Sequence, residues 1–563
     1  MAKRYRPVNR DQPFLFPPDM RDWLPPGHPV WLVITAVEDH LDTSAFHVLR
    51  RTGGAGTAGY DPDMLVTVLV WAYAHQVTSS RRIEQLCGTD VAFKVICAGN
   101  LPDHVTIARF RSAFAEAAGE FFAQVLALCA RLGMGKVGVV ALDGMKITAN
   151  ASKSANRAED KLRELAARTV AAHAAADAAE DDLFGEDARG DEVPEDAWSP
   201  RRRGERIAAA LASLEAERQA AEAARQTMEA QHLDAAAGGT PVRGRPPAGS
   251  QAELAAMRLE RARAAQLARI GDWEARAAAA AAAGKRLPGT RPASPGSCGR
   301  VRRAAAQLEK AQAKAAQAAA RTAGKDQDHP DPRPVRNITD PDARLMPVRG
   351  GTFIEGYNTQ NVTSEDGLII ATRLTQDTTD TAWFEPMLRA AQDAAALITA
   401  HRPPAPAGSQ PAPRSSDSDT AASASAIGLL LADAGYLSEH NLTIAGPDRL
   451  IATGKTRDLE KAARSGGEPA GLPWASAPIA AMAARLATPE GIAACRQRGH
   501  IAETPHGNIK HNMRFRQLSV RGNPKAAAEW AFTAAVHNLF KAITTGHLTT
   551  TALADLPSRA SPA

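Results

Sequence analysis

The sequence predicts an α/β protein in which a small sheet is interrupted by a long helical insertion and preceded by an all-helical region. Residues 137–150 and 427–437 contain short runs of aliphatic and β-branched side chains, which are typical of buried strands. Residues 155–335 are rich in Ala, Glu, Arg and Leu, which are strong helix formers. Residues 60–122 carry apolar side chains at the spacing of helices.

The composition argues against several classes of protein. The chain has 563 residues, enough for several domains, and 44% of them are hydrophobic, enough for a core. Its five cysteines are scattered and form no CxxC pair, so we expect neither a zinc site nor a disulfide framework. No run approaches the roughly 20 apolar residues of a membrane span, and the charged first residues are unlike a signal peptide. We expect a soluble, cytoplasmic protein.

Residues 1–135 are expected to form a helical domain of their own. A helix begins at Asp61, an N-cap residue that is followed by proline at the first helical position. Short helices follow, and a longer one starts at Asp103. Short helices joined by tight turns, with Arg109 and Arg111 after them, fit a helix-turn-helix DNA reader. A plain helical bundle with a solvated basic face fits equally well.

Residues 155–335 are expected to form a helical hairpin or coiled-coil insertion. Its Ala-rich, charged stretches carry only a thin apolar stripe, and Gly- and Pro-rich stretches separate them. We expect those separating stretches to be disordered, at residues 181–204, 236–250 and 283–300.

Strand signals resume after the insertion. A hairpin is expected at residues 356–362 and 368–374, and a helix follows it. Two further strands then alternate with helices. Without the insertion, this order of strand, hairpin, helix, strand, helix, strand and helices is that of a ribonuclease H-like α/β fold. The core would comprise residues 136–154 and 336–545, with a disordered tail at 546–563.

Two of the expected strands end in an aspartate. Asp143 follows VGVVAL, and Asp433 follows IGLLLA. A carboxylate at the end of a buried strand is costly unless another charge offsets it, and a divalent cation is the usual partner. The two aspartates can meet only if their strands are neighbours, which requires the intervening insertion to loop out of the sheet.

A third candidate carboxylate, Glu503, lies in a strongly basic stretch. Residues 495–525 contain this one acid and seven basic residues, namely Arg496, Arg498, Lys510, Arg514, Arg516, Arg521 and Lys525. Such a stretch suits a phosphate backbone. Carboxylates that hold two divalent ions would suit phosphoryl transfer on a polyanion. The alternative is a solvated basic helix with an incidental glutamate.

Other polar residues near these motifs have simpler interpretations. Asp377 and Asp380 are expected to cap the helix that follows them. Asn358 and Gln360, in the expected hairpin, lie near the presumed site and could orient a ligand, but structural hydrogen bonding is the simpler role.

An ordered series of motifs resembles one family. The stretches FLFPPDMRDWLPPGHPVW, YDPDML, TSSRRIEQLC and DHVTIARFR are followed by LDGMKITANAS, GYNTQNV and ADAGYLSE. Arg498, Glu503, Gly507 and Lys510 come next, and EWAFTAAVHNLFKAI closes the series. Together these motifs resemble the DDE transposases of bacterial insertion sequences, in the group named after insertion sequence 1182 of the insertion-sequence 4/5-like superfamily.

The resemblance implies a DNA transposase with a ribonuclease H-like catalytic core. Asp143, Asp433 and Glu503 match the family's catalytic, metal-binding triad, which implies Mg²⁺ or Mn²⁺ as cofactor, in two ions. The activity implied is metal-dependent cleavage at terminal inverted repeats, followed by strand transfer into target DNA.

The implied partner is double-stranded DNA, bound by a homodimer when two element ends are brought together. Arg498 and Lys510 match basic residues that contact DNA phosphates near the cut, and Arg514 and Arg516 extend the same basic stretch. With Arg109 they are the main candidate DNA-binding residues, together with Arg111.

The chain departs from the family pattern at two positions and leaves other functions open. Cys495 stands where related signatures usually carry Tyr, and His506 stands where an aromatic residue such as Phe is common. Both departures concern the positioning of DNA. A ribonuclease H-like nuclease without strand transfer remains an alternative, as does a non-catalytic DNA-binding protein derived from a transposase.

Overall fold

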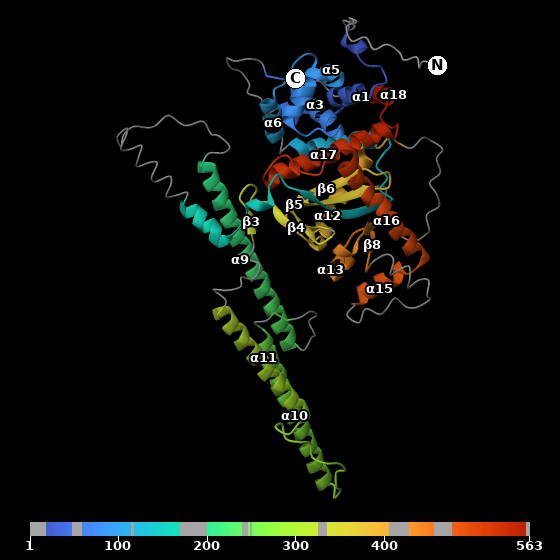
Figure 1. Ribbon diagram of the computed structural model, residues 1–563. Coiled ribbons are helices and arrows are strands. Elements are labelled where there is room, and N and C mark those ends of the chain that lie inside the picture. The colour runs from blue at the N-terminus through green and yellow to red at the C-terminus, as the bar shows by residue number, and fades with distance from the viewer. Residues whose placement is uncertain are drawn as a thin grey trace, which may run out of the picture. The chain divides into compact units, whose positions relative to one another are not determined.

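The computed structural model describes the chain in ten segments, and these form two compact units (Figure 1). The first unit comprises Met1–Asn156 and Asn337–Ala563, and the second comprises Arg157–Arg336. The second unit spans nearly the same residues as the insertion expected at 155–335. The described segments are 19–47, 59–113, 117–168, 200–238, 246–247, 250–324, 335–348, 350–404, 427–454 and 476–558.

The first unit is built on a mixed sheet of six strands. The strands are β1 (Val139–Thr148), β4 (Arg344–Val348), β5 (Thr352–Ser364), β6 (Ile369–Thr375), β7 (Leu429–Ala432) and β8 (Asp448–Ile451). Read across the sheet, the order is β6–β5–β1–β7–β8, with β4 pairing beside β6 on the long strand β5. The pairs β6–β5 and β5–β1 are antiparallel, whereas β1–β7 and β7–β8 are parallel. The predicted hairpin and the two later strands are thereby confirmed.

The central strand, β1, has an apolar side chain for each face of the sheet. Val140 and Leu142 are fully buried in the larger core, while Ala141 is buried in a smaller core with Leu431 and Leu450. A strand that is covered on both faces reads as a continuous apolar run rather than as an alternating one. This is why VGVVAL signals a central strand.

Helices cover both faces of this sheet. The helix α17 (Asn523–Thr544) packs on β6 together with α12 (Phe384–His401), and these helices contribute to the larger core (Figure 1). The helices α15 (Ala477–Leu486) and α16 (Pro489–Gly507) contribute to the smaller core on the other face. The short elements between them are η4 (Thr381–Trp383), η5 (Ala434–Tyr436), α13 (Glu439–Thr443) and η6 (Asn508–Asn512).

The N-terminal helices share the larger core instead of forming a separate domain that ends at 135. Phe121 stacks on Phe532 of α17 with ring centroids 5.4 Å apart, and the Tyr73 hydroxyl donates to Glu529 at 2.5 Å. The apolar side chains of a helix indicate that it packs, but they do not identify the element it packs against. The domain boundary expected at residue 135 therefore differs from that of the compact unit. The helices are η1 (Met20–Asp22), α1 (Pro29–Thr35), η2 (Ala36–His40), α2 (Ser44–His47), α3 (Pro62–Ala74), α4 (Ser80–Thr89), α5 (Val91–Cys97), α6 (His104–Ala113) and α7 (Ala117–Arg131).

The expectation of a disordered tail at 546–563 is wrong for residues 546–558. A short helix, α18 (Thr550–Ala554), forms there, and Leu548 and Leu553 are 1% and 2% exposed. Burial of these two leucines favours the ordered segment by about 1.5–3 kcal/mol each. Residues 559–563 lie outside the described part of the chain.

Within its described residues, the second unit contains three long helices. They are α9 (Pro200–Gly238), α10 (Gln251–Ala282) and α11 (Gly299–Gly324), and residues 159–168 are also helical. The helices α10 and α11 pack through Leu259, Ala262 and Val301. Two short strands, β2 (Asn156–Ala158) and β3 (Val335–Asn337), pair where the chain enters and leaves this unit.

Parts of the stretches expected to be disordered lie within the described residues of the insertion. Residues 283–300 form a turn with defined contacts, because the Gln266 side chain donates to the carbonyl of Ala293 at 2.6 Å and Arg291 pairs with Glu274. That expectation is therefore wrong. Residues 200–204 and 236–238 belong to α9, while 181–199 and most of 239–249 lie outside the described residues.

Two asparagines join the ends of the insertion within the first unit. The Asn337 side-chain amide donates to the Asn156 side chain at 2.8 Å and to the carbonyl of Ser152 at 2.7 Å. The backbone N–H of Ile338 donates to the carbonyl of Ala155 at 3.1 Å. The chain thus leaves and re-enters the first unit at one place.

Among the described residues, no single helix is long and apolar enough to cross a membrane. Only α6 and α7 taken together reach that length and apolar character, and the two are bent by 82° relative to each other.

Candidate active site

The two strand-borne aspartates occupy matching positions on neighbouring strands. In the parallel pair β1–β7, Leu142 is the register partner of Ala432. Asp143 is the next residue along β1 and Asp433 is the next residue along β7. Each aspartate therefore directly follows the last residue of its strand in the β1–β7 pairing. The neighbouring strands that the sequence argument requires are therefore present.

Asp143 is largely buried and has one cationic neighbour. Its side chain is 18% exposed, and Oδ1 accepts the backbone N–H of Gly144 at 3.0 Å. The Arg498 guanidinium lies 3.9 Å from Oδ1. Burial raises the pKa of Asp143 to about 6; Arg498 opposes this rise, and the charges of Asp433 and Glu503 add to it. Asp433 and Glu503 are thus close enough to Asp143 for their charges to act on it.

Asp433 is held by the turn that follows β7. Its Oδ1 accepts the backbone N–H of Gly435 at 2.9 Å, which caps the short helix η5. The aspartate is half-buried. Its carboxylate is therefore oriented by the backbone, as that of Asp143 is by Gly144.

The helix α16 brings three functional candidates to the sheet. It starts at Pro489, where the Thr488 hydroxyl accepts the N–H of Gly491 at 3.0 Å. Ile501 and Ala502 anchor it in the smaller core. Residues four apart lie on one face of a helix. Arg498 and His506 therefore flank Ala502 and reach Asp143, while Glu503 lies one position round the helix and is exposed.

The remaining predicted DNA-binding residues differ in exposure. Arg109, Arg514 and Arg516 are exposed, and Lys510 is half-buried, which lowers its pKa. Arg111 is half-buried and donates to the carbonyl of Thr78 and the hydroxyl of Ser80, so it holds the N-terminal helices together. In the described part of the chain, only Arg498 of these candidates forms an ion pair with Asp143.

A cavity of about 900 Å³ opens beside Glu503. It lies between α16, η6 and α17, and its lining includes His500, His511, Asn512 and Lys541. The exposed carboxylate thus borders a hollow with several hydrogen-bond donors.

A further carboxylate, that of Asp380, is bound by side chains of β5 rather than by the helix that follows it. Asp380 stands before η4, but its side chain makes no capping hydrogen bond. Its Oδ1 instead accepts from the side-chain amides of Asn358 at 2.7 Å and Gln360 at 2.6 Å. The expected helix cap is therefore wrong, because two amides of β5 compete for the carboxylate. The structural role expected for Asn358 and Gln360 agrees with these bonds.

The glycines after the two aspartates leave room for Asp380. A Cβ on Gly144 would lie 2.7 Å from Asp380 Oδ1, which is too close for any real side chain. A Cβ on Gly435 would lie 3.3 Å from Asp380 Oδ2 and 3.0 Å from Asp433 Oδ1. The motifs LDG and DAG were therefore the sequence signal for a further group packed against both strand ends.

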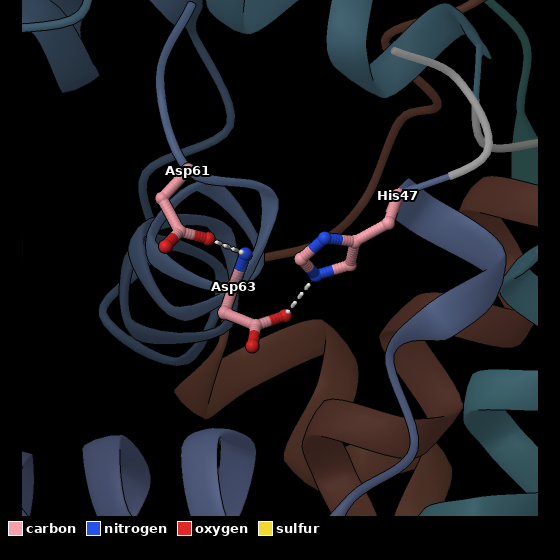
Figure 2. A group of neighbouring side chains, drawn as sticks. All are labelled: His47, Asp61 and Asp63. Atoms are coloured by element: carbon pink, nitrogen blue, oxygen red, sulfur yellow. Dashed lines mark hydrogen bonds and ion pairs between the residues drawn. The ribbon is translucent and has the colours of Figure 1, made fainter. Parts of the chain in front are cut away.

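Another group of possible metal ligands lies among the N-terminal helices (Figure 2). In His47, Asp61 and Asp63, the ligand atoms all lie within 4.8 Å of one another. Asp61 caps α3 by accepting the N–H of Asp63 at 2.8 Å, and Asp63 accepts from the Thr43 hydroxyl and pairs with His47 at 2.9 Å. The start of the helix accounts for these contacts without an ion.

Two family models match parts of the chain. One is described as a transposase domain (DUF772) and matches residues 18–113, which include the helices α1 and α3–α6. The other is described as a transposase DDE domain and matches residues 473–543, which include α16 with Glu503. Together these matches support a DDE transposase that acts on DNA. No curated protein and no solved structure matches the chain.

Proposed function

We propose that this protein is an insertion-sequence transposase that binds terminal inverted repeats, cleaves DNA there and transfers the strand to target DNA. The observation that supports this most is the convergence of Asp143 and Asp433 on adjacent strand positions, with Glu503 close enough to raise the pKa of Asp143. The group named after insertion sequence 1182 remains part of the proposal and rests on the ordered motifs.

The strand order supports a ribonuclease H-like core as the fold of this enzyme. The order β6–β5–β1–β7–β8, with the first two pairings antiparallel and the last two parallel, follows from the same succession of elements that the sequence predicts. The helix that carries Glu503 follows the last strand and packs back on β1. This returns the third carboxylate to the first.

The carboxylates fit divalent cations, and we propose Mg²⁺ or Mn²⁺ in two ions. Asp143, Asp433 and Glu503 provide the oxygen ligands that such ions prefer. The raised pKa of Asp143 shows that Arg498 does not fully offset the burial and the neighbouring negative charges. When bound, two such ions activate an attacking oxygen and stabilise the leaving one. Asp143 and Asp433 would hold both ions, and Glu503 would complete one ion's shell.

The basic residues would hold the DNA in place. Arg498 reaches into the site from α16 and would contact the phosphate next to the cut, and Lys510 would contact another. Arg514 and Arg516 are exposed on the segment that follows and would contact the backbone further along. The N-terminal helices, with Arg109, would read the element end. A homodimer would hold two ends together.

The test compares end cleavage by Asp143→Asn with that by a control variant. Asp393→Asn removes an exposed carboxylate from α12 and should cleave as the wild type does. We expect Asp143→Asn to bind inverted-repeat DNA normally but to lose Mg²⁺-dependent cleavage and joining. Hydrolysis without joined products in the wild type would identify a nuclease instead. Cleavage that survives in Asp143→Asn would overturn the assignment.

A further inference from the structure

His506 lies between Asp143 and the hairpin strand β5. It is 9% exposed, and its Nδ1 lies 3.8 Å from Asp143 Oδ2 while its Nε2 lies 3.0 Å from the side-chain nitrogen of Asn361. Asn361 is the register partner of Asp143 in the β1–β5 ladder. The imidazole therefore bridges two side chains that face each other across neighbouring strands.

The orientation of the Asn361 amide follows from its other partners. Its Oδ1 accepts from the Thr372 hydroxyl at 2.6 Å and from the Trp530 indole N–H at 3.3 Å. The indole N–H of Trp530 donates more closely to the Thr372 hydroxyl, at 2.7 Å, and that hydroxyl passes its own proton to Asn361, so the oxygen of the amide faces both donors. On its other side, the Asn361 amide nitrogen also donates to the Thr359 hydroxyl at 3.2 Å. The amide nitrogen of Asn361 consequently faces His506 and donates to it.

This orientation determines where the imidazole proton resides. Nε2 of His506 accepts from Asn361, so in the neutral ring the proton sits on Nδ1. Nδ1 is the atom directed at Asp143 Oδ2.

We propose that His506 is a positioning residue for Asp143, and that Asn361, Thr372 and Trp530 hold its Nδ1–H toward the carboxylate. The inference rests on the proposed function, because it assumes that Asp143 binds a cation. A neutral donor orients a carboxylate without adding a positive charge that would compete with that cation. The distance of 3.8 Å exceeds that of a hydrogen bond, and such bonds often tighten only when the site is filled.

A phenylalanine at position 506 would fill the space beside Asp143 but would offer no hydrogen-bond donor, so the donor and the space-filling roles of the ring can be separated.

Three variants of the full-length protein distinguish a donor from a space-filling ring. His506→Phe keeps the ring and removes the donor. His506→Asn keeps a nitrogen near the Nδ1 position. Asn361→Asp replaces the amide donor with an acceptor, which moves the imidazole proton to Nε2 or charges the ring. Thermal unfolding checks that each variant is folded.

The main measurement is the affinity for Mn²⁺ by calorimetric titration, and it is independent of activity. We expect His506→Phe and Asn361→Asp to bind Mn²⁺ about 10–100-fold more weakly than the wild type, as is typical when a residue that orients a metal ligand is lost. His506→Asn should stay within about threefold. Nitrogen NMR of protein labelled at histidine should show Nδ1 protonated in the wild type.

Specific outcomes would overturn this proposal without touching the proposed function. Wild-type affinity in both His506→Phe and Asn361→Asp, or a proton on Nε2 in the wild type, would do so. Asp143→Asn serves as the reference in the same titration. If it bound Mn²⁺ as tightly as the wild type, the metal site itself would be refuted, and with it the premise of this inference.

Discussion

The strand ends and the helix α16 contribute to the site in different ways. Asp143 is paired with Asn361 of β5, directly follows the last residue of β1 that pairs with β7, and is largely buried. Glu503, in contrast, is exposed on a helix surface beside a cavity. The strand ends set where the carboxylates must be, and the helix supplies charges that adjust them. The comparison teaches that the fold fixes the position of the Asp143 carboxylate more tightly than that of the Glu503 carboxylate, although both belong to one site.

Moving each carboxylate by one methylene group should reduce cleavage by different factors at the two positions. Asp143→Glu pushes the longer side chain into a half-closed space and should lower end cleavage by about 10²–10³-fold, because a 1 Å misplacement alone costs about 10²-fold. Glu503→Asp retracts an exposed carboxylate and should cost about tenfold. Cleavage rates at saturating DNA measure both, and equal losses would remove the proposed distinction.

The two regions should also differ in how pH affects stability. Without metal, folded Asp143 keeps its proton up to a pKa of about 6, whereas the unfolded chain releases it near pH 4. The folded state binds more protons between these values, so the free energy of unfolding should fall as pH rises across the window, by roughly 3 kcal/mol. Asp143→Asn should lack this fall in urea denaturation with EDTA at pH 4 and 7. Parallel curves for variant and wild type would contradict the prediction.

Replacing a glycine by alanine tests how much space for a Cβ atom is left at the strand end and on α16. Gly144→Ala should lower the free energy of unfolding by about 1–3 kcal/mol, because its Cβ would meet Asp380 and Gln360 at 2.7 and 3.0 Å. Gly499→Ala on α16 meets no atom within 4 Å and should stabilise the helix by up to about 1 kcal/mol. Urea denaturation of the matched pair gives the answer, and a tolerated Gly144→Ala would mean that Asp380 yields easily.

The smallest effect is expected at the exposed basic residues beyond α16. Arg516→Gln should weaken DNA binding about equally for all sequences and reduce the slope of log affinity against log salt by about 0.9. Fluorescence anisotropy over a range of salt concentrations measures that slope. An unchanged slope would place Arg516 outside the DNA contact.

Much of the sheet could be predicted, because each of its strands has a recognisable local sequence pattern. The aliphatic runs before Asp143 and Asp433 and the hairpin of β5 and β6 each have a local pattern, and chain order then suggests which strands neighbour one another. The N-terminal helices were harder to place, because their apolar faces pack on α17, which is distant in sequence. The burial of Leu548 and Leu553 likewise depends on a surface that no local pattern reveals.

The residues of the candidate site also fall into two groups, those that a local sequence pattern identifies and those that depend on contacts between distant segments. A carboxylate that ends an apolar strand, such as Asp143, is visible in the sequence, and a basic stretch marks Glu503. Asp380 looks like any residue that precedes a helix, and its actual partners come from β5. His506 points toward Asp143 only because Ala502 and Ile501 set the rotation of α16 on the sheet.

The hydrogen bond between Asn156 and Asn337 has a consequence for the history of such a chain. It brings the exit and the return of a long insertion to one point beside the sheet. Residues inserted or lost beyond that point change neither the pairing of β1 with β5 nor the distance between Asp143 and Asp433. Evolution can therefore replace the whole inserted segment without changing the register of the strands that carry the site.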